Sequence, residues 1–302
     1  MKRKLGVRPQ SVLGGIGLAI AAVACFATLD TTTKFVSAGV PLLMAVWFRY
    51  AFQAIATTVV VLPLRGIWVL RTSHPRYQLL RGLLLMSSTM LAFFSLKHTP
   101  LAEFTAIVMI TPLVITLLAA AQLGEKVSAL RWLLVIGGFV GTLIIMRPRS
   151  DDFNWALLLP LALVASNAWF QLLTSKMVRT EDPLTMQFYT GWVGTLGASV
   201  MLPFVWTTID SGVLWGALVL MGLMGTVGHF LLILAYQRAP PATLTPYLFV
   251  QIGFGMLGGW LVFSQVPDRW ALMGIAMIAV CGAMAGWLSV RESRVVPEHV
   301  ET

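Results

Sequence analysis

Ten long apolar segments, separated by short polar connections, constrain the fold of this chain more than any other feature of its sequence. An α-helix rises about 1.5 Å per residue, so about 20 apolar residues cross the ~30 Å hydrocarbon core of a bilayer. The ten segments are long enough for this, and they lie at residues 12–33, 41–63, 79–96, 103–123, 130–146, 154–175, 185–205, 213–235, 243–263 and 270–290. The sequence therefore predicts an all-α membrane protein with ten transmembrane helices, surrounded by membrane lipids.

The composition agrees with this prediction and excludes other classes. Of the 302 residues, 58% are hydrophobic and 11% are charged, whereas soluble domains carry about 25% charged residues. The 21 Lys and Arg residues give a net charge of +9. They are scattered in short groups and form no basic face, so nucleic acid is not an expected partner. Cys25 and Cys281 both lie in apolar segments and predict no disulfide framework.

The basic residues predict how the chain is oriented in the membrane. An even number of spans places both termini on one side. With the basic N-terminal residues inside, fifteen Lys and Arg lie at inner positions, Arg81 and Arg131 among them. Five lie outside, namely Lys34, Lys97, Arg147, Arg149 and Arg269. The positive-inside rule then predicts a multi-pass protein of the cell inner (cytoplasmic) membrane with cytoplasmic N- and C-termini.

The chain also repeats itself. A shift of 142 residues aligns Lys34 with Lys176 and Pro41 with Pro183, and a shift of 140 aligns Pro100 with Pro240. We therefore divide the chain into residues 1–150 and 151–302, each with five spans. Because five is odd, the second half enters the membrane inverted relative to the first. Two inverted repeats are typical of secondary transporters, whose substrate site lies near the bilayer midplane between the halves.

Ten spans, two five-span repeats and a Gly-Glu turn after the fourth span resemble the drug/metabolite transporter superfamily, EamA type. The resemblance covers essentially the whole chain. In the first half, Pro112 within the span and the Gly124-Glu125 turn match the pattern of this family. The second half departs from it, with Ile252 and Ser264-Gln265 at the corresponding places. This departure argues against a symmetric pair of functional glutamates.

The resemblance implies a function and an arrangement. It implies export or exchange of a small polar metabolite by alternating access, and such metabolites are often amino-acid-like or nucleotide-like, including adenosyl amino-acid derivatives. It also implies that the first four spans of each half surround a central cavity and that the fifth spans pack at the periphery.

Two charged residues of the first half are the leading candidates for substrate binding. Arg49 lies about eight residues into the second span, close to the midplane, and we interpret it as the one basic residue buried so deeply. Its planar guanidinium suits a carboxylate or phosphate of the substrate. Asp30, nearer the outer end of the first span, would hold a substrate amine or a proton, or would neutralise Arg49. The alternative is an interfacial i,i+4 pair between Asp30 and Lys34.

Further polar and aromatic residues in the spans are candidates for the same site. Gln53 follows Arg49 by one helical turn, and His229 is the histidine inside a span, which could exchange protons near neutral pH. The remaining substrate-binding candidates are Asn167, Trp169, Gln171 and Tyr189. Each has a structural alternative, because polar residues in helical bundles often only join helices together and aromatic residues often only face lipid.

Prolines and glycines suggest where the bundle moves. Pro112 and Pro246 are predicted to kink the fourth and ninth spans and to act as gates. Small residues four apart recur in the fifth, ninth and tenth spans, where they favour close helix packing; in the ninth and tenth spans they also fit rocking or contact with a second copy of the chain in a homodimer.

Motifs of other functional classes are missing from the sequence. It has no GxxxxGK[ST] phosphate loop, no clustered metal-ligand spacing and no serine-histidine-acid arrangement, so we expect no cofactor and no metal. The alternative to a transporter is a membrane-embedded enzyme or lipid-handling protein that binds a charged headgroup through Arg49. Such an enzyme would need several clustered acid, base or metal-binding residues, and Asp30, Arg49 and His229 lie in different spans. We therefore predict a transporter and no enzyme.

Overall fold

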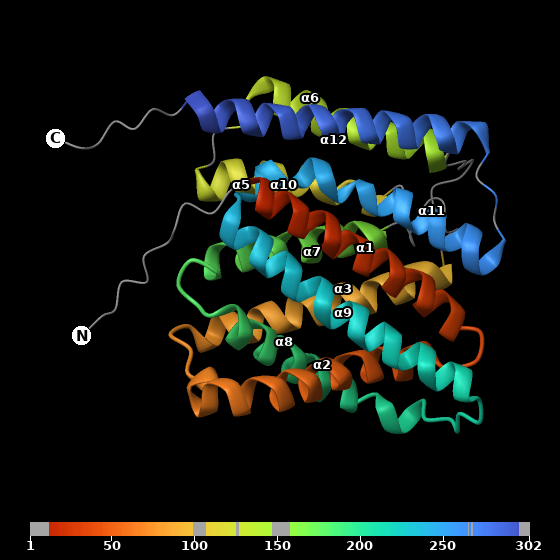
Figure 1. Cartoon of the computed structure of the whole chain (residues 1–302). Helices are drawn as coiled ribbons and strands as arrows, with labels where there is room; N and C mark the ends of the chain where they lie inside the picture. The colour runs from red at the N-terminus through yellow and green to blue at the C-terminus, as the bar shows by residue number, and fades with distance from the viewer. Residues whose placement is uncertain are drawn as a thin grey trace, which may run out of the picture.

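The computed structural model describes residues 12–98, 107–124, 127–146, 158–264, 266 and 268–295, and these residues fold into helices (Figure 1). The long helices, in chain order, are α1 (Val12–Val36), α2 (Leu42–Arg65), α3 (Pro75–His98), α5 (Thr111–Leu123), α6 (Ala129–Met146), α7 (Leu158–Met177), α8 (Pro183–Ser199), α9 (Gly212–Arg238), α10 (Pro241–Leu248), α11 (Val250–Phe263) and α12 (Arg269–Val295). Two short 3-10 helices, η1 (Gly66–Leu70) and η3 (Leu202–Phe204), follow α2 and α8.

These helices correspond to the ten predicted spans, with α10 and α11 together forming the ninth. The start of the predicted fourth span, before residue 107, lies outside the described residues. Within the part of the chain that the structure describes, five helical segments are long and apolar enough by themselves to cross a membrane, and they are Val12–Val36, Leu42–Pro63, Leu158–Met177, Gly212–Arg238 and Pro241–Phe263. Three more apolar helices are shorter. The prediction of an all-α, ten-helix membrane protein is confirmed.

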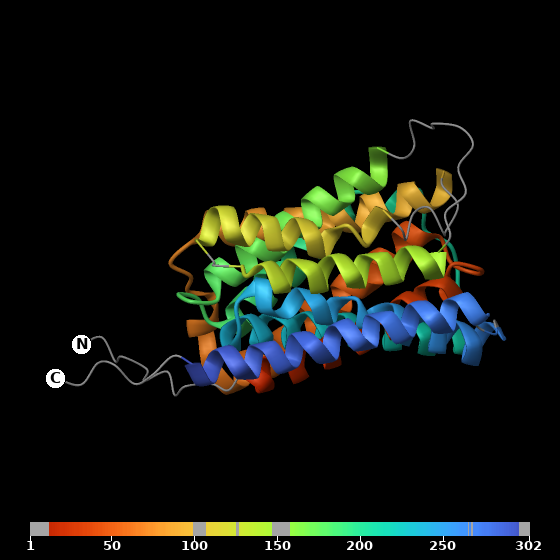
Figure 2. The same cartoon turned by 90° about the horizontal axis from the view of Figure 1, so that it is seen from above.

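The two halves interlock, and their contacts repeat when the halves are exchanged. Helix α1 packs along α9, and its counterpart α7 packs along α3. Likewise α2 contacts α9 as α8 contacts α3, and α1 contacts α10 and α11 as α7 contacts α5. Three further pairs, α2 with α8, α5 with α10 and α6 with α12, join equivalent helices. Figures 1 and 2 show α6 and α12 side by side at one edge of the bundle, where fifth spans are expected.

The directions of the helices show the inversion. Helix α1 begins and α12 ends at the same end of the bundle, which we call the terminal end (Figure 1). Helix α7, the first of the second half, begins at the opposite end and runs antiparallel to α1. An odd number of spans in the first half produces this reversal, as the sequence predicts.

The fourth span of each half ends in the same way despite a change of sequence. Gly124 after α5 and Ser264 after α11 both adopt the left-handed conformation, with φ of 67° and 55°. The backbone N–H of each donates to the carbonyl five residues earlier, on Ala119 and Gly259. The geometry of the turn is therefore retained where Gly-Glu is replaced by Ser-Gln. Glu125 itself lies outside the described residues.

The two candidate gating prolines occupy different positions. Pro112 lies in the first turn of α5, where the missing N–H of proline removes no helical hydrogen bond. Pro246 lies inside α10, which ends at Leu248, and α11 begins two residues later. Phe249, the residue between them, keeps right-handed helical backbone angles, and Pro241–Phe263 forms one span, so the kink predicted at Pro246 stays a prediction. A gating role for either residue stays a prediction.

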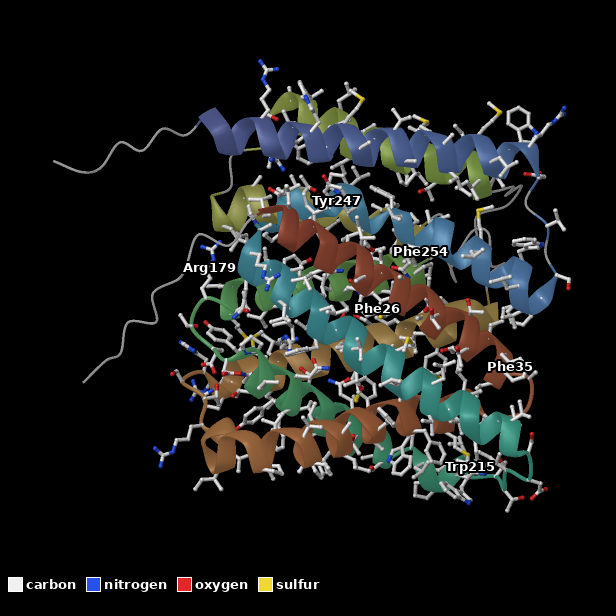
Figure 3. The ribbon with its side chains drawn as sticks, viewed as in Figure 1. Phe26, Phe35, Arg179, Trp215, Tyr247 and Phe254 are labelled. Atoms are coloured by element: carbon white, nitrogen blue, oxygen red, sulfur yellow. The ribbon has the colours of Figure 1, made fainter. Side chains whose placement is uncertain are left out.

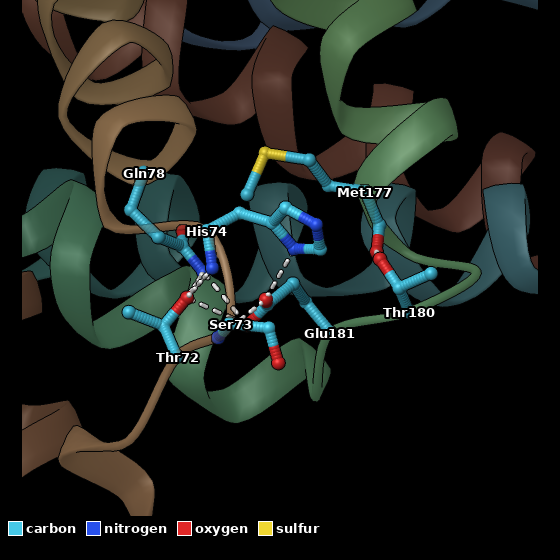
Figure 4. Close-up of polar contacts among 7 residues, drawn as sticks. All are labelled: Thr72, Ser73, His74, Gln78, Met177, Thr180 and Glu181. Carbon is cyan, nitrogen blue, oxygen red and sulfur yellow. Dashed lines mark hydrogen bonds and ion pairs between the residues drawn. The ribbon is translucent and has the colours of Figure 1, made fainter.

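At the terminal end of the bundle, a polar cluster joins the two halves of the chain, and we call it the Glu181 cluster (Figure 4). Glu181 lies between α7 and α8 and is nearly buried. Its carboxylate accepts hydrogen bonds from Thr72 Oγ1 at 2.8 Å and from the Ser73 backbone N–H at 2.9 Å. His74 Nδ1 lies 2.9 Å from the same carboxylate, and Gln78 Nε2 donates to it at 3.4 Å. The cluster therefore connects the two halves.

The opposite end of the bundle is closed by apolar side chains. Val36, Val40 and Met44 pack with Leu218 and Met221 in one buried cluster. Aromatic residues lie around it, and Trp215 is at this end of α9 whereas Arg179 is at the terminal end (Figure 3). The repeat relates the two ends by symmetry, and their chemistry differs.

Candidate functional site

Arg49 projects from α2 between α3 and α9 and is 8% exposed. Its Nη2 lies 2.8 Å from His229 Nε2 on α9, and its Nη1 donates to Thr89 Oγ1 on α3 at 3.3 Å. A shift of 140 residues relates Thr89 to His229, so the two helices offer equivalent positions to the guanidinium. The structure therefore brings together two predicted site residues, Arg49 and His229, which are 180 residues apart in the chain.

Gly225 makes the room that the Arg49 side chain occupies. A Cβ atom on Gly225 would lie 2.9 Å from Arg49 Nε. That Nε is buried and has no hydrogen-bond partner. No carboxylate of the described residues forms an ion pair with Arg49. A buried guanidinium with an unpaired donor is costly, so a polar partner from outside the fold would stabilise it.

Aromatic rings surround this pair. The guanidinium carbon of Arg49 lies 4.9 Å from the ring centre of Tyr50, whose hydroxyl is 3.0 Å from Thr89 Oγ1. The His229 ring contacts Phe26 on α1 at 4.8 Å and Phe170 on α7 at 5.8 Å, centre to centre. Figure 3 shows Phe26 in the middle of α1, away from both ends of the bundle. Sequence reasoning noted Phe170 only as an aromatic neighbour of Trp169, and it missed Phe26, Tyr50 and Thr89, because apolar runs contain many such residues.

Asp30 is exposed on α1 and does not bond directly to Arg49. Its Oδ2 accepts a hydrogen bond from Gln251 Nε2 on α11 at 2.9 Å, and Arg49 acts on it electrostatically. The alternative i,i+4 pair with Lys34 is not formed among the described residues, because the Lys34 ammonium lies over the Phe263 ring at 4.6 Å. Asp30 therefore keeps an oxygen free for another donor.

Gln53 and Gln187 connect α2, α8 and α9 next to Arg49. Gln53 Nε2 donates to the Gln187 backbone carbonyl at 3.2 Å, and Gln187 Nε2 donates to the Thr226 carbonyl at 2.8 Å. The other side-chain atom of Gln187, Oε1, is buried without a partner. The unpaired acceptor Oε1 of Gln187 and the unpaired donor Nε of Arg49 therefore belong to side chains that lie against neighbouring residues of α9, Thr226 and Gly225. Sequence reasoning did not identify Gln187, because nothing in the pattern of its span distinguishes it.

Arg81 is a second arginine that neighbouring helices bury, although it lies near the start of its helix and not near the middle of a span as Arg49 does. Arg81 lies in the second turn of α3, is 1% exposed, and donates to Thr174 Oγ1, Thr190 Oγ1 and the Met186 carbonyl. Its guanidinium lies 4.9 Å from the centre of the Phe170 ring. Arg131 is also buried. Both were placed at inner positions as topology signals, because sequence alone does not show how deeply a helix end is covered by its neighbours.

The other candidates lie apart from Arg49. Gln171 Nε2 donates to Asn167 Oδ1 at 2.6 Å, and its Oε1 accepts from the Tyr236 hydroxyl at 2.6 Å, which joins α7 to α9. Trp169 is 44% exposed on α7. Tyr189 donates to the Leu70 carbonyl at the end of η1. None of these four residues forms a hydrogen bond or ring contact with Arg49, whose partners are Thr89, His229 and Tyr50.

The chemistry of the Arg49 site suits an anionic group attached to a flat ring. The guanidinium supplies the charge and a free donor, Gln187 supplies an acceptor, and the partly buried Phe26 supplies a face for a ring, whereas Phe170 is buried between Arg81 and His229. Among the described residues, no group of three or more His, Cys, Asp or Glu side chains could hold a metal ion. A buried charged site between two interlocked, inverted halves of a helical bundle defines a class, the secondary membrane transporters.

Comparison with known proteins identifies the family within this class. The model of the EamA-like transporter family matches residues 13–147 and again residues 154–285. The chain belongs to the EamA-like transporter family, and it is a multi-pass membrane protein.

The relatives are named for different substrates. The S-adenosylmethionine uptake transporter of Rickettsia felis is 26% identical over 272 residues, 89% of this chain and 91% of the relative. The riboflavin transporter of Rhizobium johnstonii is 29% identical over 283 residues, 91% of each chain. The pseudopaline exporter of Pseudomonas aeruginosa is 27% identical over 273 residues, 88% of this chain and 93% of the relative.

A solved crystal structure has the same fold. It matches with a TM-score of 0.78 at 19% identity, and covers 92% of this chain and 98% of its own. The relatives are transporters of small metabolites, which supports a transporter and not the alternative of an enzyme or lipid-handling protein.

Proposed function

We propose that the chain is a secondary transporter that moves a small zwitterionic metabolite bearing a flat heteroaromatic ring, such as an adenosyl amino acid, by alternating access. The observation that carries this proposal is the Arg49 guanidinium, which is 8% exposed, lacks a carboxylate partner among the described residues and keeps Nε unpaired. A substrate carboxylate would fill that vacancy.

The remaining groups of the substrate would meet other parts of the site. The ammonium group would bind Asp30, which is exposed on α1 and acts electrostatically with Arg49. The ring would lie against Phe26, which is only partly buried. Two of the reported relatives are named for S-adenosylmethionine and riboflavin, and both molecules carry a flat heterocycle.

The distribution of charge supports an orientation in the membrane. Arg71, Arg76, Arg179 and Arg238 belong to the terminal end of the described bundle, and Lys34 belongs to the opposite end. By the positive-inside rule, the terminal end and both termini would face the cytoplasm, with the protein in the inner membrane. Lipids would cover the α6–α12 edge, and a homodimer through the small residues of the ninth and tenth spans stays a prediction.

The test is transport by purified protein in liposomes, with S-adenosylmethionine, its decarboxylated form and riboflavin as probes. The proposal predicts that S-adenosylmethionine is exchanged much faster than decarboxylated S-adenosylmethionine, which lacks only the carboxylate. Arg49→Gln should remove this preference, while Arg76→Gln, at an exposed position at the terminal end, should keep it.

Two results would contradict the proposal. Equal transport of both adenosyl compounds would mean that Arg49 does not recognise the substrate carboxylate. Transport of riboflavin alone, unaffected by Arg49→Gln, would assign the site to a neutral flavin.

A further inference from the structure

The contact between Arg49 and His229 fixes the protonation state of the histidine. Every nitrogen of a guanidinium is a donor, and arginine has no acceptor. Because Arg49 Nη2 lies 2.8 Å from His229 Nε2, the histidine must accept through that nitrogen. Its Nε2 therefore carries no proton, and the ring is neutral with its proton on Nδ1. If His229 were an imidazolium, its Nε2–H and the Nη2–H of Arg49 would both be donors and would face each other without an acceptor.

The charges that face His229 make this state depend on Arg49. Helix α2 presents Arg49 itself, and Arg81 on α3 also acts electrostatically on His229. Helix α1 presents Phe26 against the ring and Cys25 beside the neighbouring Gly228, with Asp30 farther along and bonded to Gln251.

The other two helices packed against α9 present uncharged groups. Helix α7 presents Phe170, and α8 presents Gln187, which bonds to the Thr226 carbonyl. No carboxylate of the described residues bonds to His229 or to Arg49.

We propose that His229 is the proton-binding group of this transporter, and that it takes up a proton when the substrate carboxylate binds Arg49. A carboxylate that engages the guanidinium draws the Nη2 donor away from His229 Nε2 and brings a negative charge to the pair. A hydronium ion of the solvent then gives its proton to the vacated lone pair: one O–H bond breaks, the Nε2–H bond forms, a water molecule is released and the ring becomes an imidazolium. The bound carboxylate then faces two positive groups.

This exchange couples the proton to the substrate. Carboxylate binding favours protonation of Nε2, and by reciprocity protonation of Nε2 favours carboxylate binding, because a protonated ring no longer accepts from Arg49. The site is then most stable either with both the proton and the substrate bound or with both absent. If the bundle switches between facing outward and facing inward only in these two forms, proton and substrate cross the membrane together. The inference rests on the proposed role of Arg49 as the carboxylate site.

The first experiment needs no transported substrate. Protein labelled with ¹⁵N-histidine is placed in lipid nanodiscs, and the His229 signals are assigned by their loss in His229→Gln. We expect an unprotonated Nε2 in wild-type protein in sodium chloride. In sodium acetate of equal ionic strength, which supplies a carboxylate alone, the ring should become imidazolium.

Two variants make the first experiment decisive. Arg49→Gln should carry a proton on Nε2 in either salt, whereas Arg76→Gln should behave as wild type. A protonated Nε2 in wild-type protein in chloride, or no response to acetate, would overturn the proposal.

The second experiment measures proton movement in liposomes that contain a pH-sensitive dye. Addition of S-adenosylmethionine to wild-type liposomes should move protons in the same direction and in proportion to the substrate. In His229→Gln the ratio of protons to S-adenosylmethionine should fall to background, whereas His74→Gln, in the Glu181 cluster at the terminal end, should keep the wild-type ratio.

The outcomes separate this inference from the proposed function. Substrate movement without proton movement in wild-type protein would refute the role of His229 and leave the carboxylate site intact. Failure of S-adenosylmethionine to move at all would count against the proposed substrate class, and the acetate experiment would still decide the role of His229.

Discussion

Glu181, at the terminal end of the bundle, and Arg49, in its middle, are charged side chains with exposed fractions of 7% and 8%. The carboxylate of Glu181 has partners in Thr72, Ser73, His74 and Gln78. The guanidinium of Arg49 has His229 and Thr89, and its Nε is unpaired.

The difference shows how a structural charge can be told from a binding charge. A buried group whose hydrogen-bonding capacity is filled by the protein contributes to the fold and offers nothing to a ligand. A buried group with an unfilled donor gains a partner when a ligand arrives. Burial or charge alone would have ranked these two residues as equals.

The largest effect is expected for Arg49→Ala. Hydrogen bonds to charged groups contribute about 1.5–3 kcal/mol, so loss of the guanidinium should reduce transport of a carboxylate substrate roughly 100-fold. Arg49→Lys should also impair transport, because a compact ammonium cannot reproduce the two-point contact of the fork. Initial rates in liposomes measure both. Normal transport by a folded Arg49→Ala protein would remove Arg49 from the site.

Gly225→Ala should disturb the position of Arg49 without removing its charge. The new Cβ would lie 2.9 Å from Nε, so the guanidinium must move. We expect roughly tenfold slower transport, while alanine in a helix interior is favoured over glycine by about 1 kcal/mol. Gly216→Ala on the same helix is the matched control, because its Cβ would meet nothing within 4 Å. Equal rates for the two variants would show that the position of Arg49 is not critical.

Glu181→Gln tests the other member of the comparison. The amide removes the charge and replaces one acceptor oxygen with a donor, which leaves partners in the loop before α3 unsatisfied. We expect a loss of stability of about 1–3 kcal/mol, seen as a lower thermal midpoint in detergent, and a smaller loss of transport than in Arg49→Ala. The exposed Arg179→Gln is the control. If Glu181→Gln had the larger effect on transport, the cluster would belong to the transport mechanism.

Lys34→Ala should have the smallest effect. The ammonium is exposed at the opposite end of the bundle and lies over the Phe263 ring, and it forms no ion pair with Asp30 among the described residues. We expect transport rates within about twofold of wild type, as for other exposed charges. A large loss of transport would mean that the Lys34 ammonium is part of the binding site. It would also weaken the proposal that Asp30 binds a substrate ammonium.

The sequence by itself determined the architecture of this protein. Apolar length predicts the spans because each helix must satisfy its own backbone hydrogen bonds in lipid, and this requirement is local. The repeat and its odd number of spans predict the inversion, which the opposed directions of α1 and α7 confirm. The depth of Arg49 in its span also follows from a count along one helix.

Tertiary structure alone decided which side chains meet. The contact of Arg49 with His229 spans 180 residues, and the room for it depends on Gly225 in another helix. Arg81 looked like a charge at a helix end and is buried, because α7 and α8 cover that end of α3. Hydropathy and helical spacing describe one helix at a time, whereas the rotation and offset between packed helices are set by side chains of both partners, and those offsets bring Arg49 and His229 together.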